Sequence, residues 1–470
     1  MELGWGLTDY IPAFIYLTAI GCGILAIVKR VDIAIYFFVF FLPLQNILNY
    51  ANEFPRGKDL NDFLLLCMII GWIIQKRKKH EPLFEKTILN IPLIILTAYT
   101  FFETCLGSQT LGLGSTISVR DPLFVSWKNY MFSPLIYLIV VNNLKKKEQV
   151  KILVLIMALS ILVLDRNFYN VIKYRDTSHY DENYLKVITV GTALGGNWLA
   201  VFLAQYAAVV LALFTMDKNI WRKIFFGVTA GLSYYCILFL FSRSGYLATV
   251  ASLLVLGIVK DKKILLGLIV IFLFWTAILP TAVKERISMT RTNDSWDRTT
   301  MERFGMWEQG KSMIREKPIL GRGFDITAQI AVRESEFDDY AWNSFHNSYL
   351  QTLVEMGVVG LLLVLSIYGI GFYSGYKLFR LGKDGFQRGL GLGVMACVPA
   401  ILFGNIAGSY WQYYNIIGFF YVYVALAHRV MLNLLDDDKR EHISDSTERP
   451  TKVQSLRKSR QLFRRVNLTQ

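Results

Sequence analysis

The stretch SFHNSYLQTLVEMGVVGLLLVLSIYGIGFYSGY (Ser344–Tyr376) joins a polar segment to a long apolar run. From Leu350 onward the run is long enough, at the rise of an α-helix, to cross a hydrocarbon layer of about 30 Å. The polar segment before it, Thr281 to Phe345, is the only long hydrophilic insertion between hydrophobic stretches. His346 lies at the boundary between the two, where a side chain can contact both water and a membrane-borne molecule.

Similar apolar runs recur along most of the chain. Hydrophobic residues make up 54% of the 470 residues and charged residues only 18%, and the mean hydropathy is +0.38. A soluble globular chain would carry about 25% charged residues, so a soluble two-domain protein is excluded. We predict an all-α polytopic membrane protein with about thirteen (12–14) transmembrane helices. The runs lie near 10–28, 31–48, 59–75, 87–105, 126–143, 149–165, 194–215, 222–241, 244–260, 263–280, 350–376, 388–406 and 411–431.

The positions of Lys and Arg predict the orientation of these helices. Cationic residues near the ends of membrane spans are retained on the cytoplasmic side. The basic clusters fall on alternate connections, which places the amino terminus outside and the carboxyl terminus inside. The segments expected on the outer face are Asp165–Ala193, the turn at Arg243 and Thr281–Phe345. The predicted organisation is transmembrane helices 1–10 in 1–280, a large periplasmic loop with short helices in 281–345, helices 11–13 in 346–432, and a basic, disordered cytoplasmic tail in 433–470.

The formal net charge of +14 does not indicate nucleic acid as a partner. Much of the excess is accounted for by the cytoplasmic clusters and by the tail after Leu434. The charge of the tail either serves simply to set the topology, which we prefer, or binds anionic headgroups of the inner leaflet. The first 30 residues lack a basic start and a small-residue cleavage pattern, so we expect a retained first span rather than a signal peptide.

The sequence shows no machinery for metal or nucleotide chemistry. The five cysteines are scattered through predicted spans and read as packing residues. There is no phosphate-binding glycine-rich loop ending in Lys-Ser or Lys-Thr, and no paired cysteine or histidine ligands. We therefore expect no cofactor and no metal site.

An arginine between two apolar runs, as in Phe241-Ser242-Arg243-Ser244-Gly245, is costly to hold near hydrocarbon. It serves either as a topological charge or as a functional group. A guanidinium flanked by small hydroxyl residues and glycine suits a diphosphate, because its planar fork binds phosphate oxygens in pairs.

Three blocks together resemble the O-antigen ligase and O-antigen polymerase superfamily of bacterial envelope glycosyltransferases. Phe241–Ala248 resembles its Ser-Arg-Ser/Thr-Gly turn. Arg303 and Trp307, followed by Lys317–Phe324, resemble its periplasmic-loop pattern. His346–Leu361 resembles its segment that begins His-Asn and contains Glu-Xaa-Gly. The blocks cover the central third of the chain.

The resemblance implies metal-independent transfer of a glycan from a polyprenyl-pyrophosphate carrier to an acceptor hydroxyl, on the periplasmic side of the inner membrane. It implies that His346 is the catalytic base and that Arg243 holds the carrier pyrophosphate. The family also has an arginine ahead of a Gly-rich, Asn-containing segment. Gly191–Asn197 matches that segment, but the nearest preceding cation is Lys186, so the second phosphate clamp is Lys186, Arg175 or an arginine of the large loop.

Further candidates come from the residues themselves. Helical spacing over Thr299–Met313 puts Arg303 and Trp307 on adjacent turns, where Arg303 is expected to contact ligand and Trp307 either to pack or to stack on a sugar. Gly321 and Gly323 permit a tight turn that brings Arg322 close to phosphate or serves only as a connector. Asn347 or Ser348 is expected to cap the helix that follows His346, and Asn347 is also a candidate for substrate contact.

Two classes of function remain open from the sequence. One is a glycan-transferring enzyme, and the other is a flippase that only moves a lipid-linked glycan. Because polar residues gather on one face rather than deep in the spans, the enzyme is favoured. Within that class, polymerisation of O-antigen or exopolysaccharide repeat units is preferred over ligation to lipid A–core or to protein. The sequence leaves open the sugar, its linkage, the oligomeric state and any partner that controls chain length.

Overall fold

The structure is a computed structural model that describes residues 10–112, 118, 121–174, 176–180, 194–289, 291–292, 295–296, 298–329 and 344–447. For the described residues within 291–299 and for 439–447 it describes the backbone only. The first half contains α1 (Ile11–Val28), α2 (Val31–Phe41), α3 (Gln45–Leu48), η2 (Asn49–Glu53), η3 (Gly57–Asp59), α4 (Leu60–Lys78), α5 (Asn90–Thr110), α6 (Pro122–Asn143) and α7 (Lys147–Ile172).

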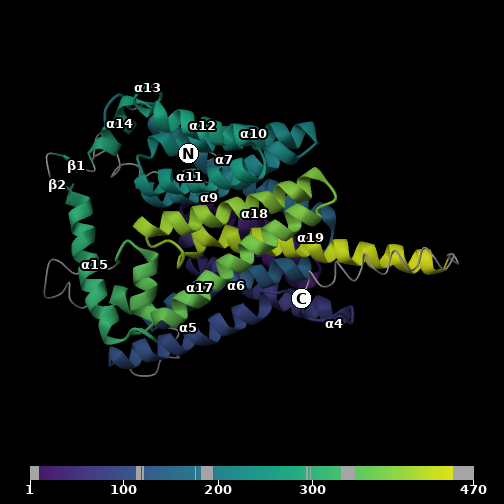
Figure 1. Cartoon of the computed structure of the whole chain (residues 1–470). Coiled ribbons are helices and arrows are strands. Elements are labelled where there is room, and N and C mark those ends of the chain that lie inside the picture. Colours follow the sequence, from purple (N-terminus) through teal and green to yellow (C-terminus); the bar gives the residue numbers. More distant parts are fainter. Residues whose placement is uncertain are drawn as a thin grey trace.

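The second half contains α9 (Gly196–Met216), α10 (Ile220–Phe239), α11 (Arg243–Val259), α12 (Lys262–Leu273), α13 (Trp275–Ile278), α14 (Thr281–Ser288), β1 (Arg291–Thr292), β2 (Ser295–Trp296), α15 (Arg298–Glu316), α17 (Ser348–Leu381), α18 (Gly385–Gly404), η4 (Asn405–Ala407) and α19 (Tyr414–Thr447). The two short strands pair antiparallel. The long helices lie side by side in one bundle, α15 lies across one end of it, and α19 extends from the other end (Figure 1).

The helices are those of a multi-pass membrane protein. Within the described residues, 8 helices are long and apolar enough to cross a membrane, or up to 9 if the pair α2 and α3–η2, bent by 110°, forms one broken span. The all-α prediction is confirmed, and the predicted apolar runs are mostly helical, although 31–48 is divided between α2 and α3 and 263–280 between α12 and α13. The count of about thirteen spans is not confirmed, because several helices are too short or too charged. For example, α12 has 12 residues and is only about 18 Å long.

Two predicted boundaries change in the structure. The run expected to end at residue 165 continues to Ile172 in α7, and Asp165 is buried there, 2.6 Å from Ser233 Oγ, instead of opening a loop. At the carboxyl end α19 continues to Thr447, past the boundary predicted at residue 432. Ion pairs of Asp437 with Lys147 (2.8 Å) and of Asp438 with Lys383 (2.9 Å) tie this extension to neighbouring helices.

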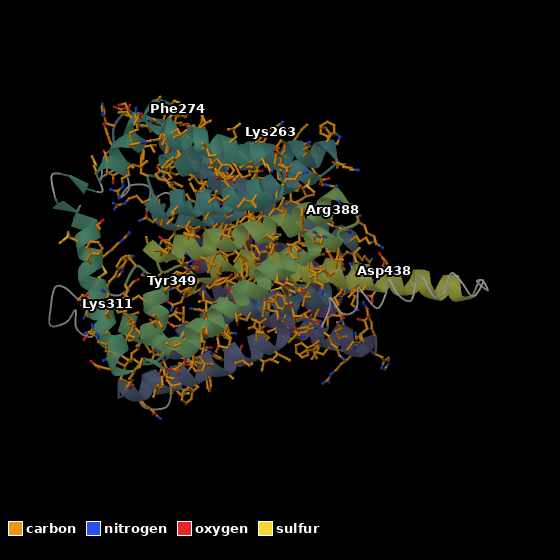
Figure 2. All side chains as sticks on the ribbon, in the orientation of Figure 1. Lys263, Phe274, Lys311, Tyr349, Arg388 and Asp438 are labelled. Atoms are coloured by element: carbon orange, nitrogen blue, oxygen red, sulfur yellow. The ribbon has the colours of Figure 1, made fainter. Side chains whose placement is uncertain are left out.

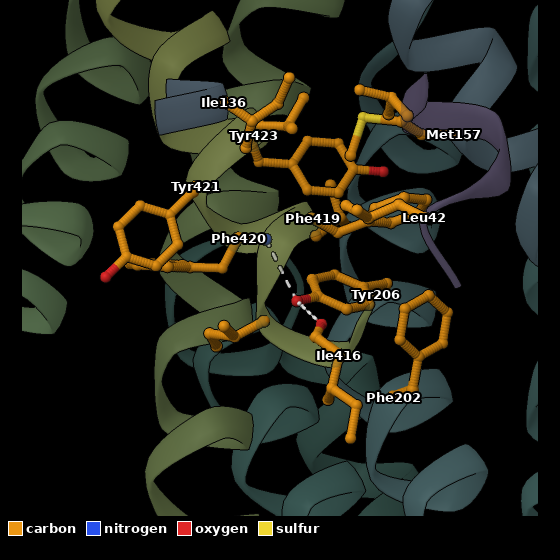
Figure 3. Close-up of a cluster of buried hydrophobic side chains, with 14 of the residues drawn as sticks. Leu42, Ile136, Met157, Phe202, Tyr206, Ile416, Phe419, Phe420, Tyr421 and Tyr423 are labelled. Atoms are coloured by element: carbon orange, nitrogen blue, oxygen red, sulfur yellow. Dashed lines mark hydrogen bonds between the residues drawn. The ribbon is translucent and has the colours of Figure 1, made fainter. Parts of the chain in front are cut away.

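The core is aromatic and lies between α9 and α19. Tyr206 is fully buried, and its phenol donates to the carbonyl of Ile416 (2.7 Å) and accepts from the backbone N–H of Phe420 (3.1 Å) (Figure 3). Ile416 and Phe420 are four residues apart in α19, so the Tyr206 hydroxyl bonds the same C=O and N–H groups that form one hydrogen bond of a regular α-helix. The core therefore holds the amino end of α19 in a defined position against α9.

The helix α17 is bent at Gly357, which has φ 61° and ψ −168°. The segment Lys317–Phe324 docks into this bend. The N–H groups of Arg322 and Gly323 donate to the carbonyls of Val354 and Glu355 (both 2.9 Å). In return, the N–H groups that follow the bend donate to carbonyls of the segment, Val358 to Pro318 (3.0 Å) and Val359 to Ile319 (3.3 Å).

This docking explains the glycines of the two motifs. Gly321 and Gly323 have φ values of 86° and 128° and allow the tight turn predicted around Arg322. A Cβ atom on Gly357 would lie 2.1 Å from the carbonyl oxygen of Ile319. As predicted, α15 ends at Glu316, just before Pro318. The carboxyl end of α15 is thus fixed to the bend of α17.

We predict that Gly357→Ala destabilises the protein by about 1–3 kcal/mol, because alanine is strained at positive φ and its methyl group would collide with the docked segment. The measurement is thermal unfolding of the detergent-solubilised protein. Gly369→Ala is the control, since Gly369 lies on the same helix with no atom within 4 Å of an added Cβ. Equal melting temperatures for the two variants would contradict the role of the bend.

Candidate functional site

His346 sits in a short, constrained loop at the amino end of α17. Its backbone is in the left-handed region, with φ 47°, and its N–H donates to Ser344 Oγ (3.2 Å). The next residue, Asn347, caps α17 through a bond from the N–H of Leu350 to its Oδ1 (3.0 Å). The cap uses the Asn347 side chain, and it fixes where the helix begins and which way His346 leaves it.

A second loop, Gly408–Tyr413, packs against the His346 loop. Ser348 Oγ donates to Asn405 Oδ1 (2.5 Å), and the N–H of Tyr410 donates both to Ser348 Oγ (3.1 Å) and to Asn405 Oδ1 (2.9 Å). Ser344 Oγ lies 3.1 Å from Ser409 Oγ. The two loops therefore form one hydrogen-bonded unit at the end of the bundle where Figure 2 labels Tyr349 and Lys311, opposite Arg388 and Asp438.

The helix α15 covers this unit. Trp307 Nε1 donates to the carbonyl of Phe345 (2.9 Å), and Met306, Phe345 and Val354 form a small apolar cluster with the Trp307 ring against it. The buried side of α15 is formed by Met306 and Gly310, whereas Met301 and Phe304, which helical spacing placed on that side, are exposed. Trp307 thus holds the chain next to His346.

Arg303, one turn before Trp307, acts electrostatically on His346. The surrounding chain desolvates the imidazole, and the positive charge of Arg303 is close enough to oppose protonation, so both lower the pKa of His346 below its ordinary value of 6.5. A neutral imidazole at neutral pH is the form that can accept a proton.

Arg243 is the first residue of α11 and is half-buried. The turn before it is tight, with Phe241 at φ 49°, and the carbonyl of Phe241 accepts from Arg286 Nε (3.3 Å). Ser242 caps the helix by accepting from the N–H of Gly245 (3.4 Å). This turn presents Arg243 at the amino end of a helix, where the backbone dipole favours an anion.

Tyr410 connects the Arg243 turn to the other two blocks. It is buried, and burial raises the pKa of its phenol, while a hydrogen bond with Ser244 and the charge of Arg303 lower it. Ser244 follows Arg243 directly, and Arg303 also faces His346. The Tyr410 phenol therefore bonds the turn of Arg243 and lies within electrostatic reach of α15, two segments that are far from it in the sequence.

Not every predicted residue joins this centre. Arg322 pairs with Glu316 at the bend of α17, and within the described part of the chain it makes no hydrogen bond or ion pair with His346. Lys186 and Arg175 lie outside the described residues. Among the residues that the structure describes, no group of three or more His, Cys, Asp or Glu side chains could hold a metal ion.

Sequence reasoning missed a buried polar network beneath the His346 loop. Glu355 is fully buried and accepts from Gln351 Nε2 (3.0 Å) and Gln412 Nε2 (2.7 Å). Gln351 Oε1 lies 3.4 Å from Ser344 Oγ, so the network reaches the residue that binds the His346 N–H. The Glu-Xaa-Gly pattern was the available signal. Tyr410 and Gln412 carried no signal, since they sit in an aromatic stretch at the start of the apolar run predicted near 411–431.

Comparisons with known proteins find similar sequences in one family. A sequence model of the family described as O-Antigen ligase matches residues 228–365, which include Arg243, Arg303 and His346. A protein of Rickettsia bellii named "Putative polysaccharide ligase" is 26% identical over 255 residues, 50% of this chain and 58% of the relative. One of Rickettsia typhi with the same description is 29% identical over 174 residues, 34% of this chain and 41% of the relative. The chain therefore spans less than two thirds of the length of these relatives.

We predict that Arg303→Gln raises the pKa of His346 toward 6.5, because one of the two causes of its lowering is removed while desolvation remains. The measurement is an NMR titration of the histidine side chains, with the His346 signal assigned by substitution. Lys311→Gln is the control, since it removes the same charge from an exposed position of α15. An unchanged or lower His346 pKa in Arg303→Gln would contradict the electrostatic contact.

Proposed function

We propose that this chain, whose residues 228–365 match the O-Antigen ligase family model, transfers a glycan from a polyprenyl-pyrophosphate carrier to an acceptor hydroxyl. Two observations carry the proposal. The loops that hold His346 and Tyr410 are joined by hydrogen bonds, and Arg303 acts electrostatically on both residues, while the Tyr410 phenol bonds Ser244, the neighbour of Arg243. Separate segments supply two cations and a base with a lowered pKa to one end of a membrane bundle. That combination suits a reaction with an anionic leaving group and a hydroxyl nucleophile.

His346 is the general base in the proposed step. It takes the proton of the acceptor hydroxyl as the oxygen forms a bond to the anomeric carbon of the glycan. The bond from that carbon to the pyrophosphate oxygen breaks, and its electron pair leaves on the polyprenyl pyrophosphate. The proton remains on His346 until it is lost to water, so charge and atoms balance.

Arg243 and Arg303 stabilise the leaving group. Negative charge develops on the pyrophosphate as the anomeric bond breaks, and fixed guanidinium groups lower the cost of that charge. Arginine offers paired N–H donors that match phosphate oxygens. The half-buried position of both side chains limits competing water, which strengthens the attraction. Arg322 and Lys186 remain proposed as additional phosphate contacts, and Asn347 acts by capping the helix behind His346.

The proposed setting is the inner membrane of a bacterium, with the site facing the periplasm, the amino terminus outside and the carboxyl terminus in the cytoplasm. The charge distribution supports this orientation. Lys76, Lys145 and Arg429 contact Glu81 or Glu85 at one end of the bundle, where cationic residues are expected on the cytoplasmic side. A lipid-linked donor reaches the site from the outer leaflet in this arrangement.

The acceptor separates a ligase from a polymerase. The relatives named as putative polysaccharide ligases favour a ligase, and we propose lipid A–core as the acceptor in that case. Polymerisation, in which the acceptor is another carrier-linked repeat unit, was preferred from the sequence, and it uses the same base and phosphate contacts. The experiment below distinguishes these two acceptors.

We predict that purified protein in lipid nanodiscs transfers glycan from polyprenyl-pyrophosphate-linked repeat units in buffer containing EDTA, and that His346→Asn lowers the rate by about 100-fold or more, because the base is lost. His80→Asn is a matched control. Both histidines have positive φ, 47° and 52°, which asparagine tolerates, and His80 is exposed at the carboxyl end of α4.

Gel analysis of the glycan products identifies the acceptor. A ladder from donor alone identifies a polymerase, whereas product formed only after addition of lipid A–core identifies a ligase. Full activity of His346→Asn would contradict the role of His346. No transfer by the unmodified protein to either acceptor would contradict the proposed function and favour a flippase.

A further inference from the structure

An aromatic pair adjoins the proposed reaction centre on the far side of Tyr410. Trp198 stands in the first turn of α9, and its ring lies 4.5 Å from that of Tyr413, with 36° between the planes. Trp198 also meets the Tyr410 ring edge-on, at 6.3 Å. Tyr413 is 38% exposed and Trp198 is half-buried, so the pair presents ring surface to its surroundings.

Hydrogen-bonding groups flank this pair. Tyr413 lies close enough to Asp325 and Glu355 to interact electrostatically with both carboxyl groups. Glu355 is enclosed and already bonded to two glutamine side chains, whereas Asp325 is half-buried and takes a hydrogen bond from Ser126. A carboxyl group has several lone pairs, which leaves Asp325 with capacity to accept more hydrogen bonds. The amide of Gln412 is already bonded to Glu355 and Gln351, so it positions the Tyr413 loop and leaves Asp325 as the group with free capacity.

The backbone of Asp325 is in a strained conformation. Its φ is 56°, a left-handed conformation that is uncommon for residues other than glycine. It follows directly the segment docked in the α17 bend, where the N–H of Phe324 donates to the carbonyl of Glu103 (3.1 Å). Strained residues of this kind persist where the surrounding structure requires their position. Here the result is a carboxyl group placed beside an aromatic surface.

We propose that Trp198 and Tyr413, with Asp325, form a subsite that binds a pyranose ring of the glycan substrate. The face of an aromatic ring carries partial negative charge and attracts the C–H hydrogens of a sugar face. The carboxyl group accepts hydrogen bonds from sugar hydroxyls. Apolar rings with a few placed polar groups are the usual lining of small-molecule sites.

The location fits a substrate that enters the reaction centre. Tyr410 touches Trp198 with its ring and Ser244 with its phenol, so one residue separates the aromatic pair from the proposed pyrophosphate contacts. The identification of the ligand as glycan rests on the proposed function. The same chemistry would hold a sugar of the carrier-linked donor or of the acceptor, and kinetics distinguishes the two.

The test begins with binding, because binding does not depend on turnover. The probe is the repeat-unit oligosaccharide released from its carrier by mild acid, titrated calorimetrically into purified protein in nanodiscs. We expect Trp198→Ala and Tyr413→Ala to weaken binding by about tenfold or more and Trp198→Phe, which keeps a ring, to recover most of it. Trp221→Ala is the matched control, since Trp221 is 78% exposed and begins α10 at the opposite end of the bundle.

Asp325→Asn keeps the size of the side chain and provides a second variant that does not remove a ring. We expect it also to weaken oligosaccharide binding, and this result decides the matter if Trp198→Ala does not fold. Equal binding by the unmodified protein, Trp198→Ala and Asp325→Asn, or no binding by the unmodified protein, would overturn the subsite and leave the pair as interfacial anchors.

Transfer assays separate this inference from the proposed function. A rise in KM for the carrier-linked donor, with kcat nearly unchanged in Trp198→Ala, assigns the sugar to the donor, and a rise in KM for the acceptor assigns it to the acceptor. If the unmodified protein binds the oligosaccharide but transfers nothing, and Trp198→Ala weakens that binding, the subsite stands and the proposed function fails. If transfer proceeds while Trp198→Ala binds normally with unchanged KM, only the subsite fails.

Discussion

The bend of α17 at Gly357 leaves backbone groups without intrahelical partners inside a membrane bundle, and the rest of the site depends on how they are satisfied. Unpaired N–H and C=O groups are costly where water is absent. The segment after α15 supplies four of the missing backbone bonds, and the phenol of Tyr99 donates to the carbonyl of Met356 (2.7 Å). The bend is stable because a separate piece of chain completes it.

That exchange of hydrogen bonds determines where α15 lies. With its carboxyl end held at the bend, α15 crosses the end of the bundle and packs over the His346 loop through Trp307 and Phe345 (Figure 1). Arg303, one turn before Trp307 on α15, then lies within electrostatic reach of His346 and Tyr410. The glycines of the segment Lys317–Phe324 therefore help to position Arg303, although the two seem unrelated in the sequence.

The charges at this end are arranged for a neutral base beside cations. Bringing a guanidinium near an imidazole opposes protonation of the imidazole, so the same arginine that attracts a phosphate also keeps His346 able to accept a proton. The buried Glu355 network beneath the loop supports the geometry, since its hydrogen bonds reach both Ser344 and Gln412. The two loops that hold His346 and Tyr410 are thus joined both by direct hydrogen bonds and through the Glu355 network.

The sequence by itself determined the helical membrane fold, the division between α10 and α11 at Arg243, the end of α15 before Pro318 and the tight turn around Arg322, because these follow from local hydrophobicity, charge and backbone preference. It also pointed to Arg243, Arg303 and His346, through their places beside apolar runs or on a predicted helix and through a resemblance to a known family. Only the tertiary structure decided that the loops of His346 and Tyr410 are joined, with Ser244 and Arg303 acting on the Tyr410 phenol. It also decided that the Glu-Xaa-Gly pattern is a bend filled by another segment, and that Trp198 faces Tyr413. Such contacts join positions up to 215 residues apart, as Trp198 and Tyr413 are. They are set by packing between helices, which local sequence pattern does not record.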